Sequence, residues 1–263
     1  MELIRPIVRL GNSAGVVLPK EWLNGKAKVQ LIVKPSNPEK EVLEILSPYL
    51  EDIQGIYLVG SYARNEQTPE SDIDIIVVSN NTKRVISSGK YNIQIFTLGG
   101  LVNTIKNAPV TILPSILEAK SILNAPLLDY IRQLSTKKIS ISGYLSECKR
   151  IININKGFIA LDRKNGEFLK NKEVVYSAIL RLRGIYIARL LLENKKYTKQ
   201  GFLSWLKSNL SISKEDLKSA LDIYTSIKDD KKIAKSVNIN IAEALIVLLE
   251  KEVISLGKKK KAS

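Results

Sequence analysis

Residues 60–74 read GSYARNEQTPESDID, and the apolar run IYLV at residues 56–59 leads into them. The apolar run predicts a buried strand, and Gly60 permits a tight exit from it. Ser61 can cap a helix that follows, so that backbone N–H groups at its start face a phosphate. A break then leads into a second apolar strand over residues 73–78.

Asp72 and Asp74 lie at the start of this second strand. Residues two apart on a strand face the same way, so both carboxylates are expected to point at one place beside the phosphate-binding turn. Two carboxylates about 4 Å apart, at an effective dielectric near 20, repel by roughly 4 kcal/mol. A cation removes that repulsion, and Mg²⁺ favours a few carboxylates together with substrate phosphate oxygens. The alternative is a turn with two surface aspartates.

This spacing resembles the signature of the nucleotidyltransferase superfamily that includes DNA polymerase beta, and looks most like its minimal nucleotidyltransferase branch. The family pattern is a strand, Gly-Ser, a helix and loop, and Asp-x-Asp on the next strand. Gly60, Ser61, Asp72 and Asp74 match it position by position, and Arg64 falls where that branch often has arginine. The resemblance implies Mg²⁺-dependent transfer of a nucleoside monophosphate from an NTP. It makes Asp72 and Asp74 catalytic metal ligands, and the other three residues nucleotide-binding.

Two-metal phosphoryl transfer usually recruits a third carboxylate. In the resembling family it lies on the strand after Asp-x-Asp, predicted here over residues 91–97, where Gln94 occupies the expected position. Glu118, on a helix predicted over residues 111–122, could replace it. Three interpretations stay open: a one-metal enzyme, an enzyme with a relocated acid, and a nucleotide-binding relic.

Residues 4–23, IRPIVRLGNSAGVVLPKEWL, resemble the SpoVT/AbrB-type DNA-binding domain. In that family two chains interleave their strands, and a segment of about 35 residues cannot bury a core alone. The resemblance implies a homodimer formed through residues 1–35. It also implies DNA contacts near the loop, made here by Arg5, Arg9, Asn12 and Ser13. A dimerisation clasp that does not bind DNA is the alternative.

The patterns along the chain predict an α+β protein in four parts. A small swapped-hairpin β module (1–35) precedes a nucleotidyltransferase mixed sheet with helices (39–137), an all-α C-terminal bundle (138–257) and a basic tail (258–263). Strands are predicted over residues 5–10, 16–19, 29–33, 55–59, 72–78 and 91–97. Helices are predicted over residues 39–50, 98–107, 111–122, 125–134, 141–161, 172–193, 199–209, 213–227 and 240–256.

The net charge of +15 is unevenly distributed. Residues 1–137 hold 15 basic and 13 acidic residues, whereas residues 138–263 hold 26 and 13. A surplus confined to one half suggests a surface there that contacts a polyanion, either a nucleic acid (DNA or RNA) or a nucleotide. Codon bias is the alternative, because the chain is also rich in Ile, Asn and Ser.

Composition excludes several classes of site. The chain has no histidine, which rules out Ser-His-Asp and Cys-His catalysis and His-ligated zinc. Cys148 is the only cysteine, so no internal disulfide forms, and a reducing cytoplasm is expected. No apolar run reaches the roughly 18–20 residues of a membrane span, and the N-terminus lacks the pattern of a signal peptide.

Arg183 lies in the middle of an apolar face of the helix predicted over residues 172–193, so it needs a partner. It either forms a buried ion pair or faces the substrate cleft as a nucleotide-binding residue. Arg181 and Arg189 fall on other faces and are expected to be solvated. The predicted function is nucleotidyl transfer to an unidentified acceptor. A DNA-binding, nucleotide-sensing regulator and a nucleotidyltransferase-type antitoxin paired with a toxin are the alternatives.

Overall fold

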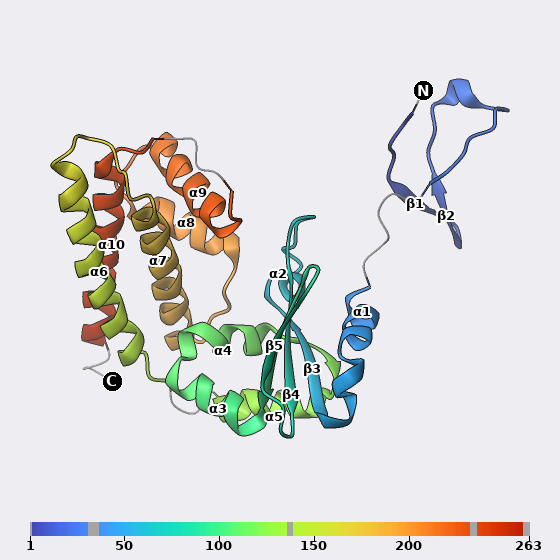
Figure 1. Cartoon of the computed structure of the whole chain (residues 1–263), viewed down its shortest axis with the longest axis horizontal. Helices are drawn as coiled ribbons and strands as arrows, with labels where there is room; N and C mark the ends of the chain where they lie inside the picture. Colours follow the sequence, from blue (N-terminus) through green and yellow to red (C-terminus); the bar gives the residue numbers. More distant parts are fainter. Residues whose placement is uncertain (1, 31–36, 136–138, 232–235, 260–263) are drawn as a thin grey trace. The chain divides into compact units, whose positions relative to one another are not determined.

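The computed structural model of this chain describes residues 2–30, 37–135, 139–231 and 236–259 (Figure 1). The chain divides into two compact units, Met1–Asn37 and Pro38–Ser263. Strands and helices occur together, with a two-stranded sheet in the first unit and a five-stranded sheet in the second. The α+β class is therefore confirmed. The segments predicted at 39–137 and 138–257 lie within one compact unit.

The first unit is a β-hairpin, in which β1 (Ile7–Leu10) pairs antiparallel with β2 (Ser13–Val16). Gly11 turns the chain with a φ of +59°. A short 3-10 helix, η1 (Lys20–Trp22), follows. The second strand begins three residues earlier than predicted. Residues 29 and 30 form no strand, and the rest of the strand predicted over 29–33 lies outside the described residues.

The sheet of the second unit has the order β5-β6-β4-β3-β7. Only β4 and β6 are parallel, and every other neighbouring pair is antiparallel. The mixed character of the predicted sheet is therefore confirmed. Its strands are β3 (Ile53–Val59), β4 (Ile73–Ser79), β5 (Arg84–Ser88), β6 (Tyr91–Thr97) and β7 (Lys120–Leu123).

The two faces of this sheet are buried in different ways, because alternate residues of a strand point to opposite faces. On one face, Ile75 and Val77 pack with Val42 and Leu46, which α1 (Pro38–Ile45) and the following residue supply. On the other face, Ile76 and its neighbours pack beneath three helices and join the core of the C-terminal bundle. These helices are α3 (Leu98–Asn107), α4 (Pro109–Glu118) and α5 (Ala125–Ser135). The 3-10 helix η2 (Ser47–Asp52) leads into β3.

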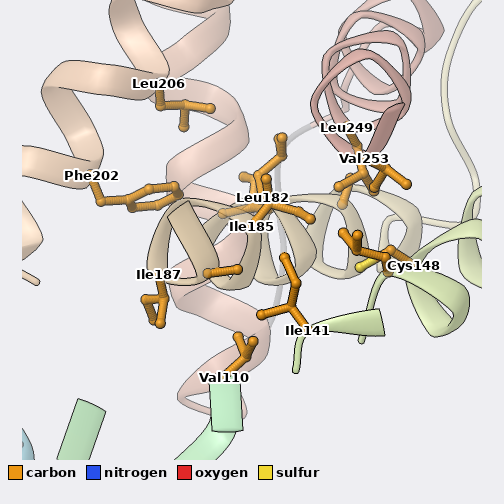
Figure 2. Packing of buried hydrophobic residues seen from close by; sticks show 14 of the residues in the cluster. Val110, Ile141, Cys148, Leu182, Ile185, Ile187, Phe202, Leu206, Leu249 and Val253 are labelled. Carbon is orange, nitrogen blue, oxygen red and sulfur yellow. The ribbon is translucent and has the colours of Figure 1, made fainter. Parts of the chain in front are cut away.

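The C-terminal helices pack around α7 (Glu173–Leu192), which is buried along most of its length. Figure 2 shows Leu182 and Ile185 of α7 among Cys148, Phe202 and Leu249 from three other helices. The buried residues of α7 are distributed around the helix, so α7 does not have the single apolar face that was predicted. The other helices are α6 (Ser142–Arg163), α8 (Lys199–Asn209), α9 (Lys214–Lys228) and α10 (Ile239–Lys259).

Two arginines of α7 differ from their predicted state. The side chain of Arg189 forms an ion pair with Glu252 of α10, and the Glu252 side chain is only 6% exposed. Nε of Arg181 is buried without a hydrogen-bond partner. Neither residue is freely solvated. In the part of the chain that the structure describes, no helix has both the length and the apolar character needed to span a membrane.

Candidate active site

Gly60 joins β3 to the short helix α2 (Gly60–Arg64). It has a φ of +70°, and a Cβ at this position would lie 2.6 Å from Oδ2 of Asp74. The backbone angle and the close carboxylate therefore both require glycine. Since the helix begins at Gly60, Ser61 is its second residue, and no side chain caps the helix. The prediction that Ser61 caps this helix is wrong.

Asp74 is half-buried near the start of β4, where Nδ2 of Asn92 donates a 3.2 Å hydrogen bond to its Oδ1. Asp72 precedes the strand and is exposed. Burial raises the pKa of Asp74, and the charge of Asp72 adds to this shift, whereas the Asn92 hydrogen bond opposes it. Ionisation of Asp74 in the folded protein therefore costs free energy unless a positive charge lies nearby, and a bound cation would supply that charge.

Asn92, rather than Gln94, lies beside the carboxylates. In the parallel register of β4 and β6, Asp74 is opposite Asn92, and Gln94 is opposite Ile76, one step further from the turn. This corrects the placement of Gln94 next to the aspartates. Asn92 and Gln94 are both amides, and β6 has no Asp or Glu, so the strand supplies no third carboxylate.

Glu118 ends α4 and approaches the turn from another direction. Its Oε1 accepts a 3.2 Å hydrogen bond from the backbone N–H of Gly60 and a 2.6 Å bond from Nη1 of Arg64. Burial raises the pKa of Glu118, and Arg64 opposes that shift. Within the described parts of the chain, no three His, Cys, Asp or Glu side chains lie close enough to hold a metal ion together. Asp72 and Asp74 still fit Mg²⁺, which commonly takes one or two carboxylates and completes its shell with phosphate and water oxygens.

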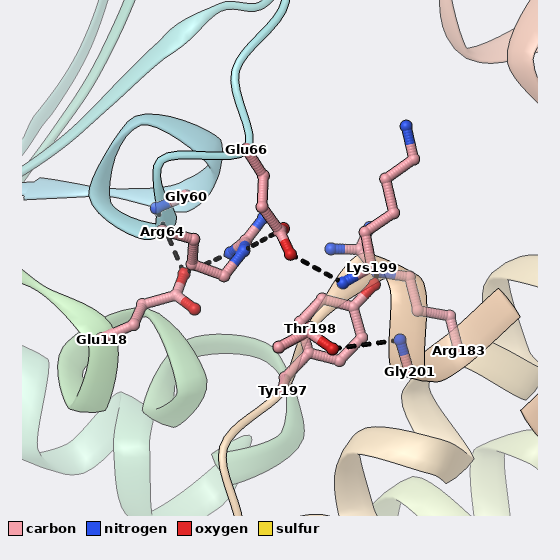
Figure 3. Close-up of polar contacts among 9 residues, drawn as sticks. All are labelled: Gly60, Arg64, Glu66, Glu118, Arg183, Tyr197, Thr198, Lys199 and Gly201. Carbon is pink, nitrogen blue, oxygen red and sulfur yellow. Dashed lines mark hydrogen bonds and ion pairs between the residues drawn. The ribbon is translucent and has the colours of Figure 1, made fainter. Parts of the chain in front are cut away.

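Arg64 is held by two carboxylates rather than left free for a phosphate. Its Nε lies 2.7 Å from Oε2 of Glu66, its Nη1 contacts Glu118, and its side chain is only 16% exposed (Figure 3). Oε1 of Glu66 in turn accepts a 3.1 Å hydrogen bond from the backbone N–H of Lys199, the first residue of α8. The direct phosphate contact predicted for Arg64 would require it to leave these partners. In this structure it links the glycine turn to the helical bundle.

Arg183 of α7 faces the same region. Its Nε donates a 3.1 Å hydrogen bond to the hydroxyl of Tyr197, and its guanidinium carbon lies 5.2 Å from the centre of that ring. Arg64 lies 5.4 Å from the same ring. Among the described residues, no carboxylate forms an ion pair with Arg183, so the buried ion pair is not found. The charge of Arg183 also lowers the pKa of Glu118, which places the arginine near the glycine turn.

Lys228, at the end of α9, acts on the carboxylates from the bundle. Its charge is among the influences that lower the pKa of Asp74, although burial outweighs them. Lys228 is exposed, as is Lys199 at the start of α8. The bundle therefore brings the positive charge of Lys228 close enough to act on Asp74.

The residues predicted to contact DNA fall into two places in the hairpin unit. Arg9, Asn12 and Ser13 gather at the turn, where Nε of Arg9 donates to the carbonyl of Gly11. Arg5 precedes β1 at the open end of the hairpin. All four residues are exposed, so these side chains are not held in a core.

Sequence reasoning assigned no role in the site to Asn92, Glu66, Tyr197 or Lys228. The alternation of β6 places Asn92 on the same face as Gln94, but alternation does not give the register between strands. The contacts of Glu66 and Tyr197 span the sheet and the bundle, and no local pattern encodes such distances.

Residues 39–142 match the family described as "Nucleotidyltransferase domain". This segment contains the five-stranded sheet, the glycine turn and both aspartates, so the part of the chain that carries the candidate site is the part that matches the nucleotidyltransferase domain family. The match covers less than half of the chain and does not include the hairpin unit. No curated protein matches the sequence.

Two solved structures resemble the chain at low identity. One is a nucleotidyltransferase-like protein from Exiguobacterium sibiricum 255-15, with 12% identity, a TM-score of 0.37, and coverage of 83% of this chain and 75% of that one. The other is spectinomycin adenyltransferase AAD(9) from Enterococcus faecialis with ATP and spectinomycin, with 14% identity, a TM-score of 0.47, and coverage of 81% and 97%. Both TM-scores are below 0.5, so neither likeness carries an argument about this chain.

Proposed function

We propose that this protein transfers a nucleoside monophosphate from an NTP to an acceptor in a Mg²⁺-dependent reaction. The observation that carries the proposal is the contact between the Asp74 carboxylate and Gly60 at the start of α2. That contact brings an acidic pair and a tight glycine turn together inside a nucleotidyltransferase domain. To bind a triphosphate, a protein needs side chains that hold a cation and a turn whose backbone comes close to the phosphates.

Each residue has a role that follows from its position. Asp72 and Asp74 hold Mg²⁺, and Gly60 and Ser61 bind the β- and γ-phosphates. The metal, when bound, neutralises phosphate charge and orients the α-phosphate. Arg183 and Lys228 contact the triphosphate from the bundle, because both are cations without a carboxylate partner among the described side chains.

In the reaction, a hydroxyl oxygen of the acceptor attacks the α-phosphorus of the NTP. A new P–O bond forms to the acceptor, whose hydroxyl proton passes to water, while the bond from the α-phosphorus to the bridging oxygen breaks and pyrophosphate leaves with that electron pair. The protein positions the reactants and stabilises charge, and no covalent enzyme intermediate is needed. Arg64 acts as a positioning residue, because it holds Glu118 against the N–H of Gly60.

A nucleotide-sensing regulator is the second candidate function. The observation that favours it is the pair of amides, Asn92 and Gln94, on the face of β6 beside the aspartates. Without a third carboxylate, the site would hold a single Mg²⁺–NTP complex, and binding itself could be the signal.

The hairpin unit supports a proposal about assembly. None of its described residues is buried, and Ile4, Val17 and Leu23 are 78%, 64% and 70% exposed. Apolar side chains left in water at this density favour a partner surface. We assign that partner to a second copy of the chain, joined through residues 1–35, with Arg5, Arg9, Asn12 and Ser13 available to DNA.

The experiment that separates enzyme from regulator uses each of the four NTPs labelled at the α-phosphate, with MgCl₂ and a cell extract as the source of acceptors. Transfer of label into protein, RNA or small molecules by the wild type, but not by Asp72→Asn, is the expected result. If the wild type binds an NTP yet transfers no label, the enzyme proposal fails and the regulator is favoured.

A further inference from the structure

A cavity of about 690 Å³ lies between the nucleotidyltransferase segment and the bundle, within the second unit. We call it the seam cavity. One side is formed by α2 and α4, and the other by the end of α7 and residues 194–198. Its apolar lining includes Pro114, Leu117, Ile187 and Leu191. A cavity of this size with a mainly apolar lining and a few polar groups is typical of small-molecule sites.

The seam cavity is not the proposed nucleotide site. Asp72 and Asp74 do not line it, whereas Arg64 and Glu118 do. The ion pair between these two side chains therefore forms a wall of the cavity, and the glycine turn lies next to it, since Glu118 also bonds the N–H of Gly60 (Figure 3). A ligand in the cavity would therefore lie close to the glycine turn, on the side of Arg64 and Glu118.

The acidic groups that line the cavity are already paired. Oε2 of Glu66 and Oε1 of Glu118 both contact Arg64, at 2.7 and 2.6 Å. Arg132 is also committed, because it donates to three backbone carbonyls at the end of α4 and pairs with Asp129. Glu66, Glu118 and Arg64 together keep one net negative charge, but both carboxylates and both arginines are already occupied by partners within the protein.

The positive groups of the cavity that do not contact Glu66 or Glu118 include two lysines, at residues 195 and 196. Lys195 lies 2.9 Å from Oε2 of Glu193, in a pair that is largely exposed. Lys196 is exposed, and no ion pair joins it to any side chain in the described part of the chain. Two adjacent lysines at the edge of an apolar cavity favour an anionic head group over a cationic one.

We infer that the seam cavity binds a small molecule with an apolar body and one anionic group, which Lys195 and Lys196 hold at the edge. The apolar body packs against Leu117, Ile187 and Leu191. The chemical class is that of a medium-chain carboxylate or a comparable apolar acid. This site is independent of the nucleotide site, so its occupancy requires neither NTP nor Mg²⁺.

Calorimetry of the full chain with sodium decanoate, without nucleotide and with EDTA, tests the inference. We expect one decanoate per chain. Octanoate should bind about tenfold more weakly, because each buried methylene contributes about 0.8 kcal/mol. Decylamine, which has the same chain length and the opposite charge, should not bind measurably. Equal binding of decanoate and decylamine, or no binding of decanoate, would overturn the inference.

Two variants with matched controls locate the site. Leu117→Trp fills the cavity and should abolish decanoate binding, whereas Leu127→Trp, at a partly buried position of the same core but away from the cavity, should not. Lys196→Glu should weaken binding about fivefold or more, whereas Lys149→Glu on the exposed surface of α6 should leave it unchanged. Lys196 is exposed, so its substitution tests the site even if Leu117→Trp disturbs folding. Wild-type affinity in Lys196→Glu and Leu117→Trp would place the decanoate elsewhere.

Discussion

Gly60 meets two demands at one backbone position, a φ of +70° and a carboxylate oxygen 2.6 Å from where a Cβ would lie. For Gly60→Ala we expect a loss of about 1–2 kcal/mol of stability from the backbone angle alone. The displaced Asp74 should also lower NTP affinity. Urea denaturation and calorimetry measure the two effects.

Gly99→Ala is the matched control for this substitution. Gly99 lies in α3, and nothing lies within 4 Å of a Cβ added there. A helical Gly→Ala change should stabilise the protein by roughly 0.5–1 kcal/mol. If Gly60→Ala stabilises the protein as Gly99→Ala does, neither the backbone angle nor Asp74 requires glycine at residue 60.

The raised pKa of Asp74 predicts that the stability of the protein depends on pH. Its pKa is raised from 3.8 by burial, so the folded protein holds this proton more tightly than the unfolded chain does. Its contribution therefore favours folding below the unfolded pKa and is lost as the pH rises through the folded pKa. In EDTA, Asp74→Asn should be more stable than the wild type near pH 7, and the difference should disappear below about pH 3.8.

Melting curves between acid and neutral pH measure this difference. Added MgCl₂ with NTP should stabilise the wild type and leave Asp74→Asn unchanged. An Asp74→Asn protein that is less stable than the wild type at pH 7 without metal would contradict the burial argument.

Helix α7 carries two arginines whose environments predict opposite losses. Arg189 pairs with Glu252, whose side chain is 6% exposed. Arg189→Met should therefore cost about 3 kcal/mol, because it leaves a buried carboxylate unpaired. Arg183 has no ion pair among the described residues, so Arg183→Met should change stability little. It should instead weaken NTP binding about tenfold or more, as expected for a charge-assisted contact.

Urea denaturation and nucleotide titration of both variants distinguish these outcomes. If Arg183→Met strongly lowers the stability of the protein but leaves the NTP affinity of the folded state unchanged, the arginine supports only the packing of the bundle. For Arg189, adding Glu252→Gln to Arg189→Met removes the unpaired charge and should restore part of the lost stability.

Elements with strong periodicity were predictable from sequence, and contacts between elements were not. The strands now seen as β3, β4 and β6 and the helices α3 and α5–α10 follow their apolar patterns closely. β7 was included in a predicted helix over residues 111–122, because a short apolar run fits either structure. β5 is a mostly exposed edge strand without an apolar alternation.

The candidate site divides in the same way. The motif placed Gly60, Asp72 and Asp74, because their spacing is local. That Asn92 rather than Gln94 lies opposite Asp74 depends on the register between β4 and β6. The ion pairs of Arg64 with Glu66 and Glu118 depend on how the segments pack. Neither the strand register nor the packing of distant segments can be predicted from one short stretch of sequence.

At the level of the full chain, Val42 is the first buried residue among those that the structure describes, and both buried cores consist of residues from Val42 onward. Deleting residues 1–37 should therefore leave residues 38–263 folded, with an unchanged helical circular dichroism signal. Light scattering should give a dimer for the full chain and a monomer after the deletion. A dimer that survives the deletion would place the interface in residues 38–263.

We propose that Asp72 and Asp74 bind an NTP through a divalent metal, and calorimetric titration of the full chain with ATP, CTP, GTP and UTP, in MgCl₂ and then in EDTA, tests this proposal most directly. We predict binding of at least one NTP in MgCl₂, with loss of that binding in EDTA and in Asp72→Asn. NTP binding that persists in EDTA, equal NTP affinity of the wild type and Asp72→Asn in MgCl₂, or no NTP binding in MgCl₂ would show that these aspartates do not bind NTP through a metal.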